Sequence, residues 1–422
     1  MASSEKFFPK NDIVTFLKIR GSSGEVGNDK IGGDRFLYRP SAFTQGTGST
    51  TGTGTAYGYN WGEVGSTFGN YRTAREEKLG NPFVTWERAV KQNIGAEVSF
   101  WKNKISTTLD YFIEKRDNIL ANPGTAPLIV GANLPAYNLG KMKNSGFDGD
   151  ITYNEKIRKV SFWVKANFTY AHNVVEFQDE VKRTYAYQNR TGQRFGQLFG
   201  LIAEGLYNTW DEVNDANRPV SAWNNNRIQP GDVKFKDVNG DGKINNDDQV
   251  PIGYSNFPEK IFGASFGLNY KGFDGSILFQ GATNVSVAYN RRHNRGWFES
   301  SGAVDYLVNS WSKERYAQGA PIWFPLLSEG DVTNKNNYQS STFWVRDASY
   351  IRLKNVELGY TFTKDALRKV GLSSIRAYVS ANNLYTWSTL FPGLDPESPP
   401  GPNNEEPYPL TRTVNMGLNI KF

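Results

Sequence analysis

The feature that most constrains the fold is an alternation of apolar and polar residues over segments of about ten residues. Residues 260–270 are typical. One parity there is apolar and the other is small or polar: Phe262, Ala264, Phe266, Leu268 and Tyr270 against Gly263, Ser265, Gly267 and Asn269. Because successive side chains of a strand point to opposite faces, each such segment predicts a strand with one apolar and one polar face.

The same alternation recurs along the 422-residue chain, at 93–100, 105–113, 160–170, 273–280, 375–382 and 413–422. Short polar turns at Lys102-Asn103 and Lys271-Gly272 predict hairpins between neighbouring strands. In residues 350–362 the apolar parity slips by one residue. A β-bulge near Asn355 is therefore predicted, since one extra residue would return the apolar side chains to a single face.

Two environments produce such strands, a soluble β-sandwich and a membrane β-barrel. Here the strands are long, their polar faces are rich in Gly, Asn and Ser, and aromatic residues gather near strand ends, for example Trp101, Tyr270, Phe273 and Trp387. Aromatic residues make up 14% of the chain, whereas no apolar run reaches the roughly 18 residues of a membrane helix. The pattern favours an all-β, antiparallel transmembrane barrel, and the final strand, which ends in Phe422, agrees with it.

Long irregular segments separate some of the strands. Residues 44–71 are rich in Gly and Thr, residues 206–257 and 282–346 are extended insertions, and residues 392–409 are rich in Pro. Within the second insertion, residues 303–316 predict one helix. Short turns on one side and long loops on the other are typical of outer-membrane barrels, so the long segments are expected to be extracellular.

The composition excludes several kinds of chemistry. The chain has no Cys and only two His, His172 and His293, which leaves no thiolate or His-rich metal site and little basis for nucleophilic catalysis. The net charge of +6 is spread without long basic runs, so no nucleic-acid partner is expected. Residues 263–267, GASFG, match a nucleophile-elbow pattern but lie inside an alternating strand, where that pattern has no catalytic meaning. We predict no catalytic residues.

One segment, DVNGDGKINNDD at 237–248, follows the spacing of an EF-hand-type calcium loop. Gly242 occupies the sixth position, where the chain turns sharply. The oxygen ligands predicted at positions 1, 3, 5, 7, 9 and 12 are Asp237, Asn239, Asp241, the carbonyl of Lys243, Asn245 and Asp248. Three interpretations are open: a structural calcium or magnesium clip, an acidic turn that binds no ion, and a signalling site.

Aromatic residues in the predicted loops are candidates for binding substrate by stacking on sugars or peptides. They are Trp210, Trp223, Trp297, Trp323 and Tyr338. The alternative for each is packing within the loops or against a partner protein.

Several phrases together resemble one family, the SusC/RagA-type TonB-dependent transporters of Bacteroidetes. They are FLKIRGSSGEVGNDKIGGDRFLY, LGNPFVTWERA, DVNGDGKINNDDQVPIGYSNFPEKIFGASFGLNYKGFDGSILFQG, FWVRDASYIRLKNVELGYTF and RAYVSANNLYTWSTLFPGLDPES. The resemblance implies the C-terminal part of a 22-stranded outer-membrane barrel, with about ten strands. It also implies import of glycan oligosaccharides or peptides beneath a SusD-like surface lipoprotein, without a catalytic step.

The family's signal peptide, TonB box and plug domain have no counterpart in residues 1–422, which we treat as one partial barrel region. The resemblance thus implies contact with TonB only through a more N-terminal part, and contact of the strands with outer-membrane lipid. Two alternatives remain: a soluble, calcium-stabilised extracellular β protein that binds carbohydrate, and a secreted hydrolase.

Overall fold

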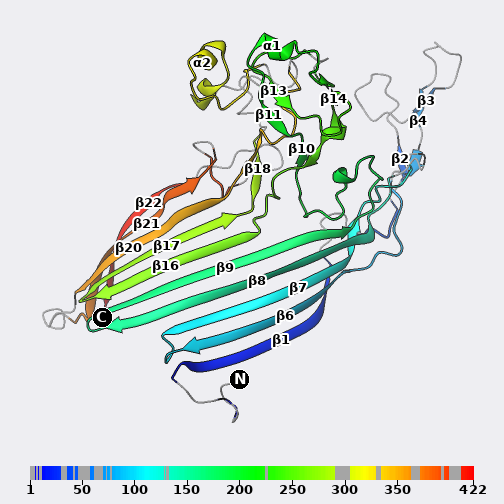
Figure 1. Ribbon diagram of the computed structural model, residues 1–422. Coiled ribbons are helices and arrows are strands. Elements are labelled where there is room, and N and C mark those ends of the chain that lie inside the picture. The colour runs from blue at the N-terminus through cyan, green and yellow to red at the C-terminus, as the bar shows by residue number, and fades with distance from the viewer. Residues whose placement is uncertain are drawn as a thin grey trace.

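Ten long strands form a single antiparallel sheet in the computed structural model (Figure 1). The structure describes residues 5, 8, 12–29, 36–40, 43–45, 58–60, 70–72, 74–76, 78–127, 129, 133–223, 227–289, 305–328, 334–362, 371–390, 394–398 and 410–422. In order across the sheet, the strands are β1 (Val14–Asn28), β6 (Glu87–Phe100), β7 (Ile105–Ala121), β8 (Tyr137–Ile157), β9 (Val160–Phe177), β16 (Lys260–Tyr270), β17 (Phe273–Thr283), β20 (Tyr350–Phe362), β21 (Ser374–Ser388) and β22 (Thr413–Lys421). This confirms the predicted all-β, antiparallel fold.

The register of the sheet collects the apolar side chains on one face. Phe266 lies opposite Val164 on one side and Ile277 on the other. The row continues from Ile277 to Val356 and then to Ala381. Cross-strand rows of this kind stabilise the sheet and give it one continuous apolar surface.

That apolar face is uncovered in the part of the chain that the structure describes. Leu358 is 66% exposed and Met416 is 82% exposed, although both lie within the sheet. An apolar surface of this extent is stable against lipid and unstable against water. The sheet is therefore a curved section of a transmembrane barrel wall, as the alternation predicted. No helix in the described residues is both long enough and apolar enough to span a membrane.

The predicted bulge is present in β20. Leu278 of β17 pairs with Asn355, but the next residue, Phe279, pairs with Leu353, so Lys354 is the extra residue. The pairing of β20 with β21 is also irregular at this place, where Lys354 stands against two residues of β21, Asn383 and Leu384. The bulge explains why the apolar parity of the sequence slips while the apolar face remains continuous.

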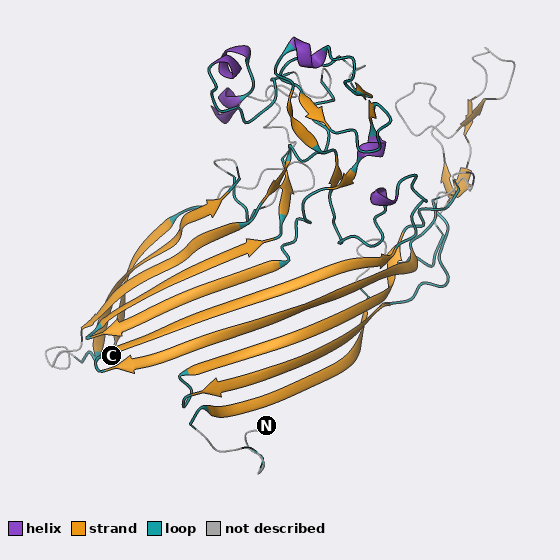
Figure 2. Cartoon of the chain, in the orientation of Figure 1, coloured by secondary structure: helices purple, strands orange, loops and turns teal. Residues whose placement is uncertain are grey.

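Short turns join strands at one end of the sheet. Between β16 and β17, Lys271 and Gly272 have φ values of 48° and 91°, as a tight two-residue hairpin requires. Between β6 and β7, Trp101, Lys102 and Asn103 also have positive φ values. The long insertions leave from the opposite end (Figure 2). This asymmetry places the short turns on the periplasmic side and the insertions outside the cell.

The insertions build a small folded region above the sheet, at its extracellular end (Figures 1 and 2). Its elements are β10 (Phe199–Gly200), β11 (Ala203–Leu206), α1 (Trp210–Val213), β12 (Val220–Ser221), β13 (Val233–Phe235), β14 (Lys243–Ile244), β15 (Val250–Pro251), β18 (Ser286–Ala288), α2 (Lys313–Ala317) and β19 (Val345–Asp347). It also contains the 3-10 turns η5 (Asn246–Asp248) and η8 (Asp305–Asn309), and a further 3-10 turn, η3 (Ala186–Gln188), lies between β9 and β10. Four further short strands lie in the segment between β1 and β6: β2 (Phe43–Gln45), β3 (Gly58–Asn60), β4 (Asn70–Arg72) and β5 (Ala74–Glu76).

The buried apolar core of the chain lies in this region, which we call the mouth region (residues 199–259, 284–289, 305–328 and 334–349). One cluster surrounds Phe324 and Trp344, and a second joins Leu201, Val233 and Phe235.

The single helix predicted for residues 303–316 is wrong. The chain forms η8 and then α2, because Ser310 bridges to Phe324 and Ser312 caps the start of α2.

We predict opposite outcomes for two neighbouring substitutions in β22. Met416→Arg puts a charge on the apolar face and should destabilise the folded protein by about 2–4 kcal/mol near the bilayer midplane. Asn415→Arg puts the same charge on the polar face and should change stability little. Urea unfolding of the protein in lipid vesicles measures both values, and equal costs for the two variants would contradict the assignment of faces.

Candidate functional site

The polar face of the sheet carries charged side chains in compensated groups. On β1, β6 and β7, Arg20 pairs with Glu97 at 2.5 Å and also with Asp110. On the same face, but on β17, β20 and β21, Arg376 pairs with Glu357 at 2.5 Å and contacts Asp274. A face that combines compensated charges with small polar residues suits the inner surface of a water-filled passage.

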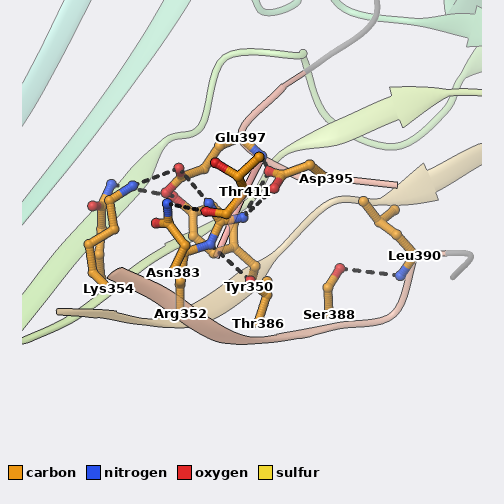
Figure 3. A network of polar contacts seen from close by, with 11 residues as sticks. Tyr350, Arg352, Lys354, Asn383, Thr386, Ser388, Leu390, Asp395, Glu397 and Thr411 are labelled. Atoms are coloured by element: carbon orange, nitrogen blue, oxygen red, sulfur yellow. Dashed lines mark hydrogen bonds and ion pairs between the residues drawn. The ribbon is translucent and has the colours of Figure 1, made fainter. Parts of the chain in front are cut away.

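A larger network anchors a loop segment on this polar face (Figure 3). Arg352 of β20 is 1% exposed and donates to both carboxylate oxygens of Asp395 at 2.8 Å. It also donates to Glu397 at 2.8 Å and to the hydroxyl of Thr386 at 2.9 Å. A planar guanidinium can make all these bonds at once, which a lysine cannot. The buried cation is thus fully compensated.

Two more side chains of β20 bind the same segment. Glu397 accepts hydrogen bonds from the Tyr350 hydroxyl at 2.7 Å and from Lys354 at 2.9 Å. Within the segment, the backbone N–H of Glu397 donates to Asp395 at 2.8 Å, which closes a tight turn. Residues 394–398, here called the inner clasp, are therefore held against the polar face near the extracellular end of the sheet.

A buried polar network fixes the mouth region itself. Asp232 is fully buried and accepts hydrogen bonds from the side-chain amides of Asn334 at 2.7 Å and Asn337 at 2.9 Å. Burial raises the pKa of the Asp232 carboxyl, and hydrogen bonds from Gln229, Asn337 and Asn334 oppose that rise in part. Because the partners are about a hundred residues apart, this network joins two separate insertions.

The loop at 237–248 has the predicted turn geometry. Gly240 and Gly242 have φ values of 75° and 78°. The Asp237 carboxylate accepts hydrogen bonds from both of their N–H groups at 2.7 Å. Asp248 is fully buried and accepts from the N–H groups of Val238 and Asn245 at 2.8 and 2.9 Å. The first and last acidic residues thereby close the loop.

Two features of this loop determine whether a cation fits it: the chemistry of its donor atoms and the spacing of its side chains. The donor set is chemically suitable, since carboxylate, amide and carbonyl oxygens are the ligands of hard cations and each carboxylate oxygen keeps a second lone pair. In the described residues, however, no three Asp, Glu, His or Cys side chains gather closely enough to hold a metal ion. A cation here would need Asn239, Asn245 and the Lys243 carbonyl as well as the aspartates.

The loop is fastened to the segment that follows β9. The Tyr187 hydroxyl donates to the carbonyl of Asp247 at 2.7 Å, and Gln188 donates to the carbonyl of Asn246 at 2.9 Å. Tyr185 stacks on Tyr187, with ring centroids 5.2 Å apart, and its hydroxyl accepts from Asn239 at 3.1 Å. The loop therefore links η3 to the mouth region.

Of the predicted stacking residues that the structure describes, Trp323 and Tyr338 belong to one apolar cluster and Trp223 packs against another. Trp210, at the start of α1, is 60% exposed. Trp223 and Trp323 are partly buried against the two apolar clusters. Tyr338 is 5% exposed and stacks on Trp344 with ring centroids 5.8 Å apart, which fits the packing alternative. Trp297 lies outside the described residues, and the stacking role of Trp210 stays a prediction.

The sequence alone did not identify the side chains whose ion pairs and hydrogen bonds join distant segments at the extracellular end of the sheet. Arg352 lies at a polar-face position of an alternating strand, which is a weak signal for a buried ion-pair centre. Glu259 is another such residue: it accepts from Arg194 at 2.5 Å and Asn284 at 2.9 Å, and lies 2.7 Å from His172. Their partners are distant in sequence, so no local pattern identifies them.

We predict that Arg352→Met releases the inner clasp. The substitution leaves Asp395 and Glu397 without their buried cation, a change that costs about 3–5 kcal/mol. Cleavage after Glu397 by a glutamate-specific protease should become at least about a hundredfold faster. Lys354→Met is the matched control, because Lys354 is partly exposed and its ion pair contributes at most about 1 kcal/mol. If the Arg352 variant were cleaved no faster than the parent protein, the network would not be what holds the inner clasp.

No protein-family model matches the chain. Among curated proteins, it is 26% identical over 445 residues to TonB-dependent receptor P3 and 28% identical over 444 residues to TonB-dependent receptor P26, both of Formosa agariphila. It is 26% identical over 444 residues to the TonB-dependent receptor SusC of Bacteroides thetaiotaomicron. These alignments cover 99–100% of this chain and 39–41% of each relative, so the chain spans about two fifths of their length.

Solved structures agree on the fold. The chain matches the structure of the RagAB peptide transporter with a TM-score of 0.69 at 20% identity, over 99% of this chain and 42% of that one. It matches the RagAB peptide importer in the open-open state with a TM-score of 0.70, also at 20% identity, over 99% of this chain and 41% of that one. At this level of identity the match establishes the barrel fold.

Proposed function

Since the chain is related over its whole length to the C-terminal part of SusC-type TonB-dependent receptors, which are outer-membrane proteins and not enzymes, we propose that it forms part of the wall of a nutrient importer. The cargo is a glycan oligosaccharide or a peptide. A SusD-like lipoprotein covers the mouth region, and TonB acts through a part of the protein outside this chain.

The observation that carries this proposal is the two-sided sheet. One face carries exposed apolar side chains, and the opposite face presents compensated charges and small polar side chains. Such a face lets polar cargo pass without binding it tightly. A soluble carbohydrate-binding protein would instead need its apolar strand residues to meet in a dry core, but Met416 is 82% exposed.

The proposal predicts energy-dependent uptake. Cells from which the gene is deleted should lose the uptake of one class of cargo, labelled oligosaccharides or labelled peptides. Restoring the gene should restore the uptake of that class. Loss of TonB should abolish the same uptake. Import that is unchanged by the deletion, for both classes of cargo, would contradict a transport role.

Trp210 allows a finer test of cargo contact in the same assay. If its exposed ring stacks on cargo, Trp210→Ala should raise the half-saturation concentration about two- to tenfold, while Trp210→Phe should stay close to the parent protein. Equal half-saturation concentrations for the alanine and phenylalanine variants would contradict a stacking role of Trp210.

We further propose that the loop at 237–248 takes up calcium or magnesium as a structural brace. A cation there would share the oxygens of Asp237, Asn239, Asp241, Lys243, Asn245 and Asp248 and stiffen the link to η3. Its position in the extracellular mouth region, away from the polar face of the sheet, supports a structural rather than a transport role.

We predict that calcium protects this loop from trypsin, which cuts after Lys243. At a calcium concentration a hundred times the dissociation constant, cleavage should slow about a hundredfold, and a chelator should reverse the effect. The double variant Asp237→Asn, Asp241→Asn should lose this response. Asp247→Asn, which changes a carboxylate outside the predicted ligand set, should keep it. Cleavage that does not depend on calcium or magnesium in the parent protein would contradict the brace.

A further inference from the structure

The short turns on the periplasmic side carry several exposed cations. Lys104 pairs with Glu155 at 2.5 Å, and Lys102 pairs with Asp12 at 3.5 Å. Five further exposed cations at this end have no ion pair with any residue that the structure describes: Lys156, Arg158, Lys159, Lys271 and Lys421. This rim is therefore an anion-attracting surface.

Strand register places three of these residues at neighbouring strand ends. Val160 of β9 and Tyr270 of β16 form the last pair of their ladder. Lys159 and Lys271 follow directly beyond that pair, and Arg158 occupies the same turn as Lys159, with a φ of 54°. The nitrogen of Lys271 lies 5.3 Å from the centre of the Tyr270 ring, a cation–π contact that holds it at the rim.

An apolar groove of about 910 Å³ begins at the same place. Tyr270 and Phe273 line its end next to Lys271, and it runs across the lipid-facing side of β17, β20, β21 and β22. The small residues Gly275 and Ala377 lie in rows of large apolar side chains and are among the residues that line it. The groove is continuous with the surface that meets the membrane.

We propose that this corner of the barrel is a binding site for an anionic phospholipid of the periplasmic leaflet. Arg158, Lys159 and Lys271 hold the phosphate, for which a guanidinium and two ammonium groups are suited partners. One acyl chain lies in the groove. An acidic periplasmic protein would use the cations but would leave the apolar groove unexplained, whereas a phospholipid is the one class of ligand that matches charge and groove together.

The test is native mass spectrometry of the purified protein in detergent, titrated with phosphatidylglycerol or with zwitterionic phosphatidylcholine of the same acyl chains. The parent protein should retain phosphatidylglycerol at least about tenfold more strongly. The triple variant Arg158→Gln, Lys159→Gln, Lys271→Gln should lose this preference, since each cation near a membrane surface strengthens binding about fivefold. Inorganic phosphate alone should not displace the lipid.

Two matched variants complete the test. The triple variant Lys182→Gln, Arg183→Gln, Lys313→Gln removes the same charge from exposed extracellular positions and should retain the preference. Ala377→Trp fills the groove and should weaken retention of both lipids, and circular dichroism confirms that each variant is folded. Equal loss in the two triple variants, or no loss in the rim variant, would overturn the proposal. So would equal binding of the two lipids by the parent protein.

Discussion

The structure depends on one constraint: a backbone that crosses a membrane must satisfy its hydrogen bonds without water. The eight inner strands of the sheet meet that constraint by pairing with a neighbour on both sides, whereas β1 and β22 each pair on one side in the described residues. Once the strands are paired, side chains alternate between lipid and the interior, and the sequence has to alternate with them. The bulge at Lys354 illustrates this, because the extra residue leaves Leu353 and Val356 of β20 on the same apolar face.

The mouth region is stabilised in a different way. Its strands are two to four residues long and cannot be stable alone, so it relies on apolar clusters and on buried polar bonds between distant segments. Asp232 with its two asparagines, and Arg352 with Asp395 and Glu397, both join segments far apart in the chain. Asp232 is buried with hydrogen bonds to both of its oxygens, and the charge of Arg352 is compensated by two carboxylates. These links give the extracellular loops a fixed shape above the passage.

Features with local causes could be predicted from the sequence. Alternation placed Phe266, Leu358 and Met416 on one face, and the slip of parity placed the bulge within one residue. The turn geometry of the loop at 237–248 also follows from nearby residues, since its aspartates bond N–H groups within the same loop. The ion it would bind is a separate question that turn geometry does not answer.

Features with distant causes could not be predicted. Segment 303–316 has the periodicity of a single helix, yet Ser310 bridges to Phe324 and interrupts it. Tyr338 looks like an exposed loop aromatic in sequence, but it packs on Trp344 in a cluster that also contains Val285 and Phe324, which are distant in sequence. Likewise, the cationic trio at the periplasmic rim arises from the register between β9 and β16, which only pairing reveals.

The most direct test of the two-sided wall is labelling of single cysteines, which the absence of native Cys makes simple. Cysteines placed one at a time along β17, from Ser276 to Phe279, would be reacted in intact outer membranes with a water-soluble and a lipid-soluble reagent. We expect positions 276 and 278 to react with the first reagent and positions 277 and 279 with the second. Protection of the apolar positions from both reagents would mean that they meet in a dry protein interior, and would contradict a membrane-spanning wall.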